Sequence, residues 1–265
     1  MSAHDHNRRA WDERARGGAR FARPATDEEI ARPDQLTDAA GWLGDVRGQR
    51  LLCLAAGGGK HGPLYAAAGA EVTVVDISGE MLALDRQVAA EKRLSLRTVE
   101  ASMDNLAALA DASFDIVCQP VSTCYIPDIA AAYREVARVL VAGGLYLSQH
   151  KQPASLQAAV RPTAAGYELT ESYYRTGPLP EVAGSLHREY GTLEFLHRWE
   201  ELIGGMCRAG FVVEDLIEPL HVKPDATAGS FGHRSRYVAP YVRIKARRTT
   251  AQVPSLGHSA FWSPD

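Results

Sequence analysis

Short apolar runs alternate along the chain with stretches in which apolar residues recur at helical spacing. In one such stretch, Ile129, Tyr133, Val136 and Leu140 would share one face of a helix. The pattern predicts strands at 50–55, 71–76, 96–100, 114–119 and 144–150, and helices at 60–69, 79–92 and 128–140. Strands and helices that alternate in this way are typical of an α/β fold with a doubly wound parallel sheet. Ligands of such sheets bind at the carboxyl ends of the strands.

The same pattern divides the chain into three parts. Residues 1–45 are expected to form an N-terminal helical cap, with one helix around Trp11 and a shorter one at 35–43. Residues 46–248 form the main domain, and residues 249–265 form a tail. Four prolines interrupt the rhythm of the main domain after residue 150, so we expect a lid inserted at about 151–190.

Beyond the lid, the alternation of helix and strand resumes. The pattern predicts a helix at 199–208 and two strands, at 211–216 and 237–244. The second strand contains Pro240, which has no N–H to give to a neighbouring strand. We therefore expect Pro240 at a bulge or at an unpaired position.

A run of glycines follows the first predicted strand. Gly57, Gly58 and Gly59 allow a tight turn and a close approach of a ligand to the backbone. The helix behind them presents free N–H groups to an electron-rich ligand. The next strand ends at Asp76, whose carboxylate can accept hydrogen bonds from a ribose diol. These features predict a pocket for a cofactor that contains adenosine.

The glycine loop alone leaves the cofactor open. Gly57, Gly59 and Gly62 have the spacing of a dinucleotide fingerprint, and Asp76 follows about 20 residues after Gly57, as in nicotinamide enzymes. An NAD(P)-dependent oxidoreductase is therefore one interpretation. The segments that follow Asp76 favour another.

Four segments occur in a fixed order after the loop: the 78–82 sequence SGEML, the 113–117 sequence SFDIV, the 133–140 sequence YREVARVL and the 143–147 sequence GGLYL. In this order they resemble the class I S-adenosylmethionine-dependent methyltransferases, of the small-molecule, type 11-like kind. The resemblance covers residues 40–150 closely and 185–246 more loosely. It implies a Rossmann-like sheet of seven strands with an antiparallel last strand, and S-adenosylmethionine as the cofactor.

The resemblance also implies an activity, the transfer of a methyl group to an O, N or C atom of a small metabolite. A protein that keeps the fold and binds the cofactor without methyl transfer, as a sensor or a cyclase, is a third interpretation, because fold does not settle function. The partner expected is a small-molecule acceptor. The oligomeric state is left open.

The residues that would hold the cofactor follow from the resemblance. Ala55, Gly57 and Gly59 match the three small positions of the family's loop, and Asp76 matches its ribose-binding acid. The full set expected at the cofactor is Ala55, Ala56, Gly57, Gly59, Asp76, Ile77, Ser102, Met103, Gln119, Pro120 and Trp11. The chain departs from the family in having Cys53 where an acid is usual.

Catalysis of methyl transfer needs alignment of the acceptor and, for a hydroxyl or ammonium acceptor, a base. His150 ends the fifth strand and is the first choice as the base, with a hydrogen-bonded rim residue as the alternative. Tyr125 and Trp11 offer aromatic faces to a sulfonium cation, although Trp11 could equally dock its helix on the core.

The expected lid is rich in tyrosine and arginine. These residues are Tyr167, Tyr173, Tyr174, Arg175, Arg188 and Tyr190. Aromatic walls with a few polar anchors fit a pocket for a small molecule. The same tyrosines could instead form a small core of the lid itself, and the sequence does not separate the two.

Composition disfavours other partners. The net charge is −3, which gives no broad basic surface for nucleic acid. No run approaches the roughly 18 apolar residues of a membrane span, and the N-terminus is polar. The four cysteines lack a C-x-x-C spacing, so we expect no metal site and reduced thiols, as in a cytoplasmic protein.

Overall fold

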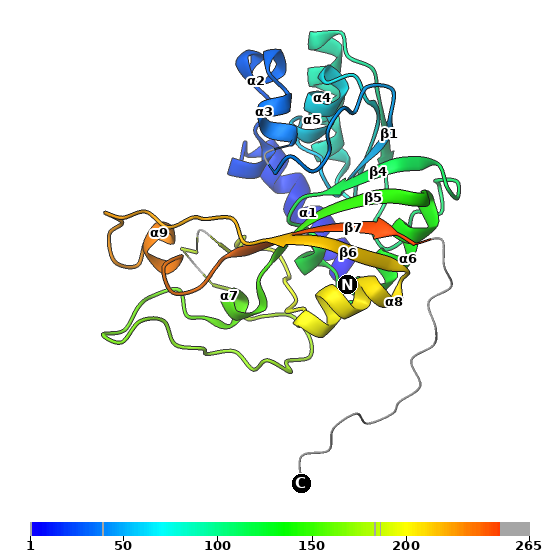
Figure 1. The fold of residues 1–265 in the computed structure, drawn as a ribbon. Coiled ribbons are helices and arrows are strands. Elements are labelled where there is room, and N and C mark those ends of the chain that lie inside the picture. The colour runs from blue at the N-terminus through cyan, green and yellow to red at the C-terminus, as the bar shows by residue number, and fades with distance from the viewer. Residues whose placement is uncertain (1, 39, 183, 186, 250–265) are drawn as a thin grey trace, which may run out of the picture.

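A seven-stranded sheet forms the centre of the protein (Figure 1). The computed structural model describes residues 2–38, 40–182, 184–185 and 187–249. The strands are β1 (Arg50–Leu54), β2 (Glu71–Asp76), β3 (Leu96–Glu100), β4 (Phe114–Gln119), β5 (Leu140–Lys151), β6 (Phe211–Ile217) and β7 (Tyr241–Arg248). Their order in the sheet is β3-β2-β1-β4-β5-β7-β6. Strands β1 to β5 are parallel, and β7 runs antiparallel to both β5 and β6, which confirms the predicted fold class.

Helices cover both faces of this sheet. In chain order they are α1 (Ala3–Arg16), α2 (Asp27–Ala31), α3 (Asp34–Thr37), α4 (His61–Ala67), α5 (Gly79–Lys92), α6 (Ile129–Val139), α7 (Pro153–Gln157), α8 (Gly205–Arg208) and α9 (Phe231–Arg234). Three further turns are η1 (Arg20–Ala22), η2 (Thr123–Tyr125) and the π-helical η3 (Glu200–Gly204).

Alternation along β1 explains the two layers of the core. Leu52 and Leu54 pack in one cluster with apolar residues of α6 and α8, whereas Leu51 and Cys53 pack in a second cluster with residues of α4 and α5. Side chains of a strand point alternately to its two faces. A strand that is apolar on both faces is therefore covered on both, as expected for the centre of a doubly wound sheet.

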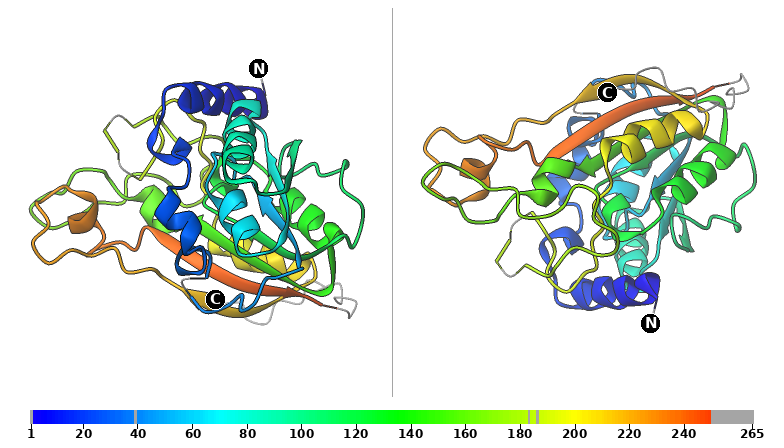
Figure 2. Two further views of the ribbon diagram at one scale, coloured as in Figure 1. Left: turned by 90° about the horizontal axis from the view of Figure 1, so that it is seen from above. Right: turned by 90° about the horizontal axis from the view of Figure 1, so that it is seen from below.

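The N-terminal cap is tied to the main domain by polar side chains. Helix α1 lies beside α5 (Figure 2), where Asp12 Oδ1 accepts a hydrogen bond of 2.6 Å from Ser78 Oγ. Further along, Asn7 Nδ2 donates to the carbonyl oxygens of Tyr125 at 2.8 Å and Leu193 at 2.9 Å. Asn7 is 2% exposed. Helix α1 therefore bridges the sheet domain and the segment around residue 190.

Some element bounds differ from the predictions. The helix expected at 35–43 is reduced to the short α3, and the strand expected at 237–244 begins only at Tyr241. Pro240 thus precedes β7, and its carbonyl accepts from the Gln152 N–H at 3.0 Å. The helix expected at 199–208 is divided into η3 and α8. A proline next to a strand removes a donor, which explains why pairing starts after it.

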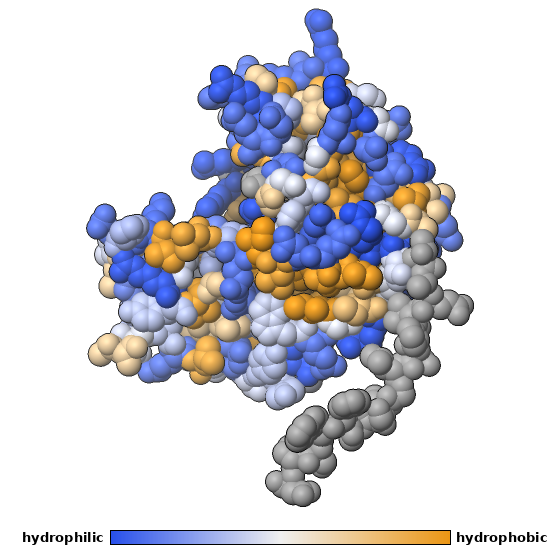
Figure 3. All heavy atoms as spheres, viewed as in Figure 1, coloured by the Kyte–Doolittle hydropathy of each residue, from blue (hydrophilic) through white to orange (hydrophobic). Residues whose placement is uncertain are grey.

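The lid expected at about 151–190 leaves the sheet after β5. It contains the short α7 and otherwise irregular backbone, and it lies with α9 on the left of Figure 1. Its limits as a separate unit stay a prediction. On the outer edge of the sheet, Val212 and Leu216 of β6 are exposed. Figure 3 shows an apolar area over this part of the sheet. Among the helices of the described residues, none is long and apolar enough to cross a bilayer.

Candidate active site

A cavity of about 550 Å³ opens at the carboxyl ends of the parallel strands. It is bounded on one side by the turns that follow β1, β2 and β4, and on the other by α1, the segment after α1 and the lid. This is the edge at which a doubly wound sheet binds its ligands. The cavity has the size of a small-molecule site.

The glycine loop forms a cradle that side chains would fill. A Cβ added to Gly57 would lie 2.8 Å from Met81 Cβ and 3.0 Å from Asp76 Oδ2. Gly58 has a φ of 119°, a conformation that favours glycine. Ala55, Ala56 and Gly57 line the cavity, as predicted. The loop can therefore bring its backbone close to a bound molecule.

Asp76 lies at the end of β2 and lines the same cavity. Its Oδ2 accepts from the Gly57 N–H and its Oδ1 from the Ser78 N–H, both at 2.9 Å. Burial raises the pKa of Asp76 to about 6, although these two N–H groups oppose the rise. Each carboxylate oxygen has a second lone pair, so Asp76 can still accept hydrogen bonds from a ribose. The loop and this acid fit the expected nucleoside.

The residues predicted to contact the adenine also lie at the cavity. Ile77, Ser102 and Met103 all line the cavity, beyond Asp76. Ser102 Oγ donates to Asp104, and Asp104 Oδ2 also lies 2.8 Å from His4 Nε2. These contacts tie the start of α1 to the turn after β3. His4, which the prediction did not include, also lines the cavity.

Two predicted cofactor residues do not line the cavity. A Cβ on Gly59 would lie 3.0 Å from the Leu84 carbonyl, so this glycine allows close packing of the loop on α5. Gln119 is 3% exposed and donates to Ser122 Oγ at 2.9 Å. Both residues lie behind the cavity wall, and their contact with the cofactor stays a prediction.

His150 is placed away from the cavity. It is fully buried, with Nδ1 2.8 Å from Thr123 Oγ1 and Nε2 2.8 Å from Ser148 Oγ. Burial lowers its pKa to about 3. Both ring nitrogens are engaged inside the protein, so this placement argues against the predicted role of His150 as the base. The next residue of β5, Lys151, points to the opposite face.

Lys151 is the centre of a buried charged cluster, which we call the lysine cluster and define as Tyr125, Lys151, Arg188, Glu189 and Glu194. Lys151 Nζ lies 2.6 Å from Glu189 Oε2 and 3.1 Å from Glu194 Oε2. Tyr125 Oη donates to Glu189 Oε2 at 2.6 Å, and Arg188 Nε lies 3.3 Å from Glu194 Oε2. The cluster joins β5 and η2 to the segment around residue 190.

Two members of the lysine cluster, Tyr125 and Glu189, line the cavity. Burial by itself would raise the pKa of Glu189, but the charge of Lys151 and the hydrogen bonds from Lys151 and Tyr125 hold it below its usual value. Burial raises the pKa of Glu194. Glu189 is therefore a carboxylate at the cavity wall. No periodicity or spacing in the sequence marks Glu189 as a site residue.

The aromatic residues predicted near a sulfonium lie together. Trp11 and Tyr125 meet edge to face with their ring centroids 5.4 Å apart, and both line the cavity with Pro120. Another part of the cavity wall is formed by residues that were not predicted, among them Gln149, His221, Phe231 and Tyr241. They come from β5, β7 and the region of α9. The order of the predicted elements along the chain does not show that these segments meet.

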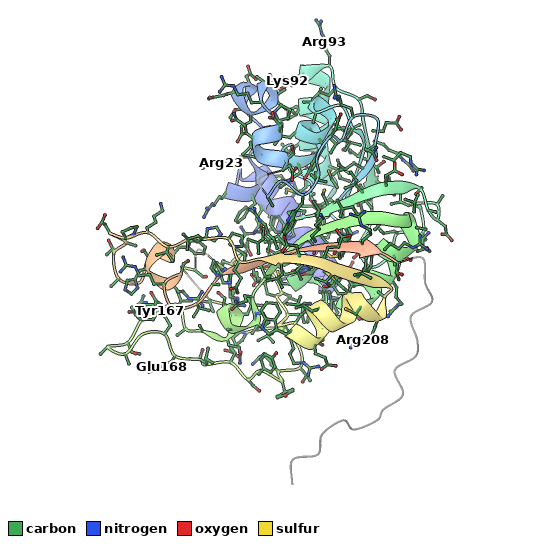
Figure 4. The ribbon with its side chains drawn as sticks, viewed as in Figure 1. Arg23, Lys92, Arg93, Tyr167, Glu168 and Arg208 are labelled. Carbon is green, nitrogen blue, oxygen red and sulfur yellow. The ribbon has the colours of Figure 1, made fainter. Side chains whose placement is uncertain are left out.

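The tyrosines of the lid lie elsewhere. Figure 4 shows Tyr167 and Glu168 on the outlying lobe of the lid, whereas Arg23, which lines the cavity, lies near α1. Tyr167 Oη is 2.9 Å from His233 Nδ1, and the rings of Tyr173 and Tyr174 pack edge to face. Neither these residues nor Tyr190, Arg175 or Arg188 line the cavity. Tyr174 and Tyr190 are 74% and 62% exposed, so these tyrosines form neither an acceptor pocket nor a shared core of the lid.

Comparison with known proteins identifies the family. Residues 52–148 match the family described as a methyltransferase domain. An uncharacterized methyltransferase of Bacillus subtilis, YbaJ, is 32% identical over 227 residues, which cover 80% of this chain and 89% of that protein. A ubiquinone biosynthesis O-methyltransferase of Xanthomonas oryzae is 34% identical over 118 residues, about half of its length.

Solved structures share the fold. An S-adenosylmethionine-dependent methyltransferase from Mesorhizobium loti superposes with a TM-score of 0.65 at 24% identity, covering 82% of this chain and all of that one. A geranyl diphosphate C-methyltransferase from Streptomyces coelicolor gives a TM-score of 0.61 at 14% identity, covering 94% and 98% of the two chains.

Fold, cavity and relatives define the class of this protein. It belongs to the class I methyltransferase family. It is an enzyme that uses S-adenosylmethionine to methylate its substrate. The predicted family, activity and cofactor are thereby confirmed, and the nicotinamide-dependent alternative is set aside.

Proposed function

We propose that the protein methylates a small-molecule acceptor that carries a hydroxyl or amine, and that Tyr125 and Glu189 remove its proton. One observation carries this proposal: a single cavity contains both the Gly57–Asp76 cradle and the Tyr125–Glu189 hydrogen bond. The relatives support small acceptors, since they include ubiquinone biosynthesis O- and C-methyltransferases.

The roles at the cofactor follow the lining of the cavity. Asp76 would accept from the ribose, Ile77 and Met103 would contact the adenine, and the backbone at Ala55 and Ala56 would pass beneath the methionine half. Ser102, near the adenine, would be a further contact. These assignments extend the family resemblance to the residues that the cavity exposes.

Two arginines extend the methionine end of the cavity. Arg20 and Arg23 line it, and neither forms an ion pair with any other described residue. Their segment lies on the glycine loop, because the Ala25 N–H donates to the Gly59 carbonyl at 2.8 Å. Guanidinium groups pair well with carboxylates. We therefore assign Arg20 and Arg23 to the carboxylate of the methionine half.

The proton route uses a hydrogen bond already present. S-Adenosylmethionine, when bound, supplies a methyl group on a positively charged sulfur that leaves as a neutral thioether. As the acceptor attacks, its proton passes to Tyr125 Oη, and the phenol proton moves across 2.6 Å to Glu189 Oε2. Lys151 stabilises the carboxylate before the transfer. The rings of Trp11 and Tyr125 are placed to favour a nearby cation, each by about 0.5–2 kcal/mol.

Tyr125→Phe tests this function. The protein is incubated with S-adenosylmethionine and a panel of small phenols, alcohols and amines, and S-adenosylhomocysteine and methylated products are measured by mass spectrometry. We expect the wild type to methylate members of the panel, and the variant to be about 100-fold slower with unchanged affinity for S-adenosylhomocysteine. Equal rates would contradict the proton route. Cofactor binding with no methylated product would instead favour a role without methyl transfer to such acceptors.

A further inference from the structure

Asp85 of α5 lies beneath the glycine loop and outside the cavity. The side chain is fully buried, and its Oδ2 accepts from the Gly58 N–H at 2.9 Å. Its Oδ1 has no hydrogen-bond partner among the described residues. The position that a Cβ would take on Gly62 lies 3.2 Å from this oxygen, so the carboxyl is enclosed between the loop, α5 and the start of α4.

A half-satisfied buried carboxyl is unfavourable for the fold. Burial raises the pKa of Asp85 to about 7, and the N–H groups of Gly59 and Gly58 and then the charge of Arg86 oppose this rise. The other buried residues of α5, including Met81, Leu82 and Val88, are apolar and would pack equally well around an apolar side chain. An unsatisfied buried polar atom is costly, so packing alone does not explain an acid at this position.

The thiol of Cys53, on β1, is within the electrostatic influence of Asp85. Burial, and then the charges of Cys118 and Asp85, raise the pKa of the Cys53 thiol, so the thiol and the carboxyl lie within electrostatic reach. Cys53 is the position at which the chain departs from the family's acid before the loop. The chain thus lacks a carboxylate on β1 and has one on α5, beneath the same loop.

We propose that Asp85 positions the glycine loop for the cofactor, reaching it from α5 in place of an acid at position 53. Asp76 and Asp85 then hold two successive N–H groups of the loop, those of Gly57 and Gly58, each at 2.9 Å. With the N–H groups of Gly57 and Gly58 held by these two carboxyl groups, the glycine loop keeps the turned conformation that leaves room for the cofactor. Asp85 is a positioning residue, since it does not touch the cavity. The inference rests on the proposed cofactor site.

The first test separates positioning from stability. Asp85→Ala and Asp85→Asn are compared with the wild type and with Gln87→Ala, an exposed control on the same helix. We expect Asp85→Ala to bind S-adenosylhomocysteine about tenfold more weakly by calorimetry, and Asp85→Asn to lie in between. At pH 8 both variants should melt at the same temperature as the wild type or higher. A purely structural role would lower the melting temperature and the affinity together, and would overturn the proposal.

The second test moves the acid. Adding Cys53→Asp to Asp85→Ala should restore most of the lost affinity, because a carboxylate is returned beneath the loop. Affinity of Asp85→Ala within twofold of the wild type, or a double variant no better than Asp85→Ala, would overturn the proposal. If the wild type binds no S-adenosylhomocysteine, the proposed cofactor site itself fails. In that case, amide hydrogen exchange at 57–59 tests whether Asp85 holds the loop in the absence of cofactor. Faster exchange in Asp85→Asn than in the wild type supports this role, and unchanged exchange refutes it.

Discussion

The two halves of the cavity are built in different ways. The cofactor half comes from a short stretch of chain, in which β1, the glycine loop and β2 place Gly57 and Asp76 only 19 positions apart in sequence. The proposed acceptor half joins Tyr125, Lys151 and Glu189, which meet through hydrogen bonds between residues 38 and 64 positions apart. The first half is a local motif on a common scaffold. The second depends on how the lid folds back on the sheet.

This difference implies that the two halves fail separately. Changes in the lysine cluster should disturb stability and chemistry while the cofactor still binds. Changes at the loop should disturb cofactor binding first.

Lys151→Met should have the largest effect, on stability. The Lys151 side chain is 1% exposed and pairs with two buried carboxylates, so its removal leaves negative charge uncompensated in the interior. We expect the free energy of unfolding to fall by about 3–5 kcal/mol, measured by urea denaturation. The matched control is Lys92→Met, whose partner Asp27 is exposed, with an expected change below about 1 kcal/mol. Similar losses in the two variants would show that the cluster does not hold the lid.

Glu189→Gln should chiefly affect the chemical step. Gln keeps the size of the side chain but cannot take the proton from Tyr125, so we expect kcat to fall about 10²- to 10³-fold. Affinity for S-adenosylhomocysteine should stay within twofold of the wild type. Glu181→Gln, at an exposed lid position that accepts from the Gly191 N–H, serves as the control. A parallel loss of cofactor affinity would break the separation between the two halves.

The strand and helix that carry the proposed cofactor half could be predicted because their signals are local. The helix predicted at 79–92 is α5 in the structure, since Ser78 caps its start and Arg93 adopts a left-handed conformation at its end. Asp76 is found at the cavity for a similar reason: an apolar strand that stops at an acid fixes where that acid lies. Such patterns depend only on neighbours in sequence.

The acceptor half escaped prediction because its placement depends on strand faces and on the lid. His150 and Lys151 are adjacent on β5, and alternation sends one into the core and the other toward the lid, a choice that the sequence does not reveal. Glu189 follows a long irregular segment without periodicity. The helix expected at 35–43 is shorter in the structure, because tertiary contacts easily override a short amphipathic pattern.

The stability of the cofactor-free protein should depend on pH through the loop. The folded-state pKa of Asp85 is raised to about 7 and that of Asp76 to about 6, above the usual 3.8. Between pH 5 and pH 8 the unfolded chain loses these protons first, so Asp85 should make the folded state less stable at pH 8 than at pH 5, by about 3 kcal/mol. Buried histidines such as His150, whose pKa is lowered to about 3, act in the opposite direction, so the Asp85 contribution is the difference between the wild type and Asp85→Asn in thermal denaturation at the two pH values. Identical pH profiles of the two proteins would show that Asp85 does not contribute.

Trp11→Ala should have the smallest effect. Trp11 lies where the proposed cofactor half and acceptor half of the cavity meet. Its ring is placed to interact with a cation, so the variant should lose more affinity for the sulfonium cofactor than for the uncharged thioether product. We expect a difference of about 1 kcal/mol, or roughly fivefold, in the ratio of the two affinities by calorimetry. Trp11→Phe should retain most of the wild-type preference for the sulfonium cofactor over the thioether product. Equal losses for both ligands would assign Trp11 to docking of α1.

Titration of S-adenosylhomocysteine into the purified protein and into Asp76→Ala tests the cofactor site most directly. The cradle of Gly57 and Asp76 predicts measurable heat and a single site in the wild type, and affinity at least tenfold weaker in the variant, which should melt near the wild-type temperature. No heat in the wild type, or equal affinities in the two proteins, would contradict the placement of the cofactor at this loop.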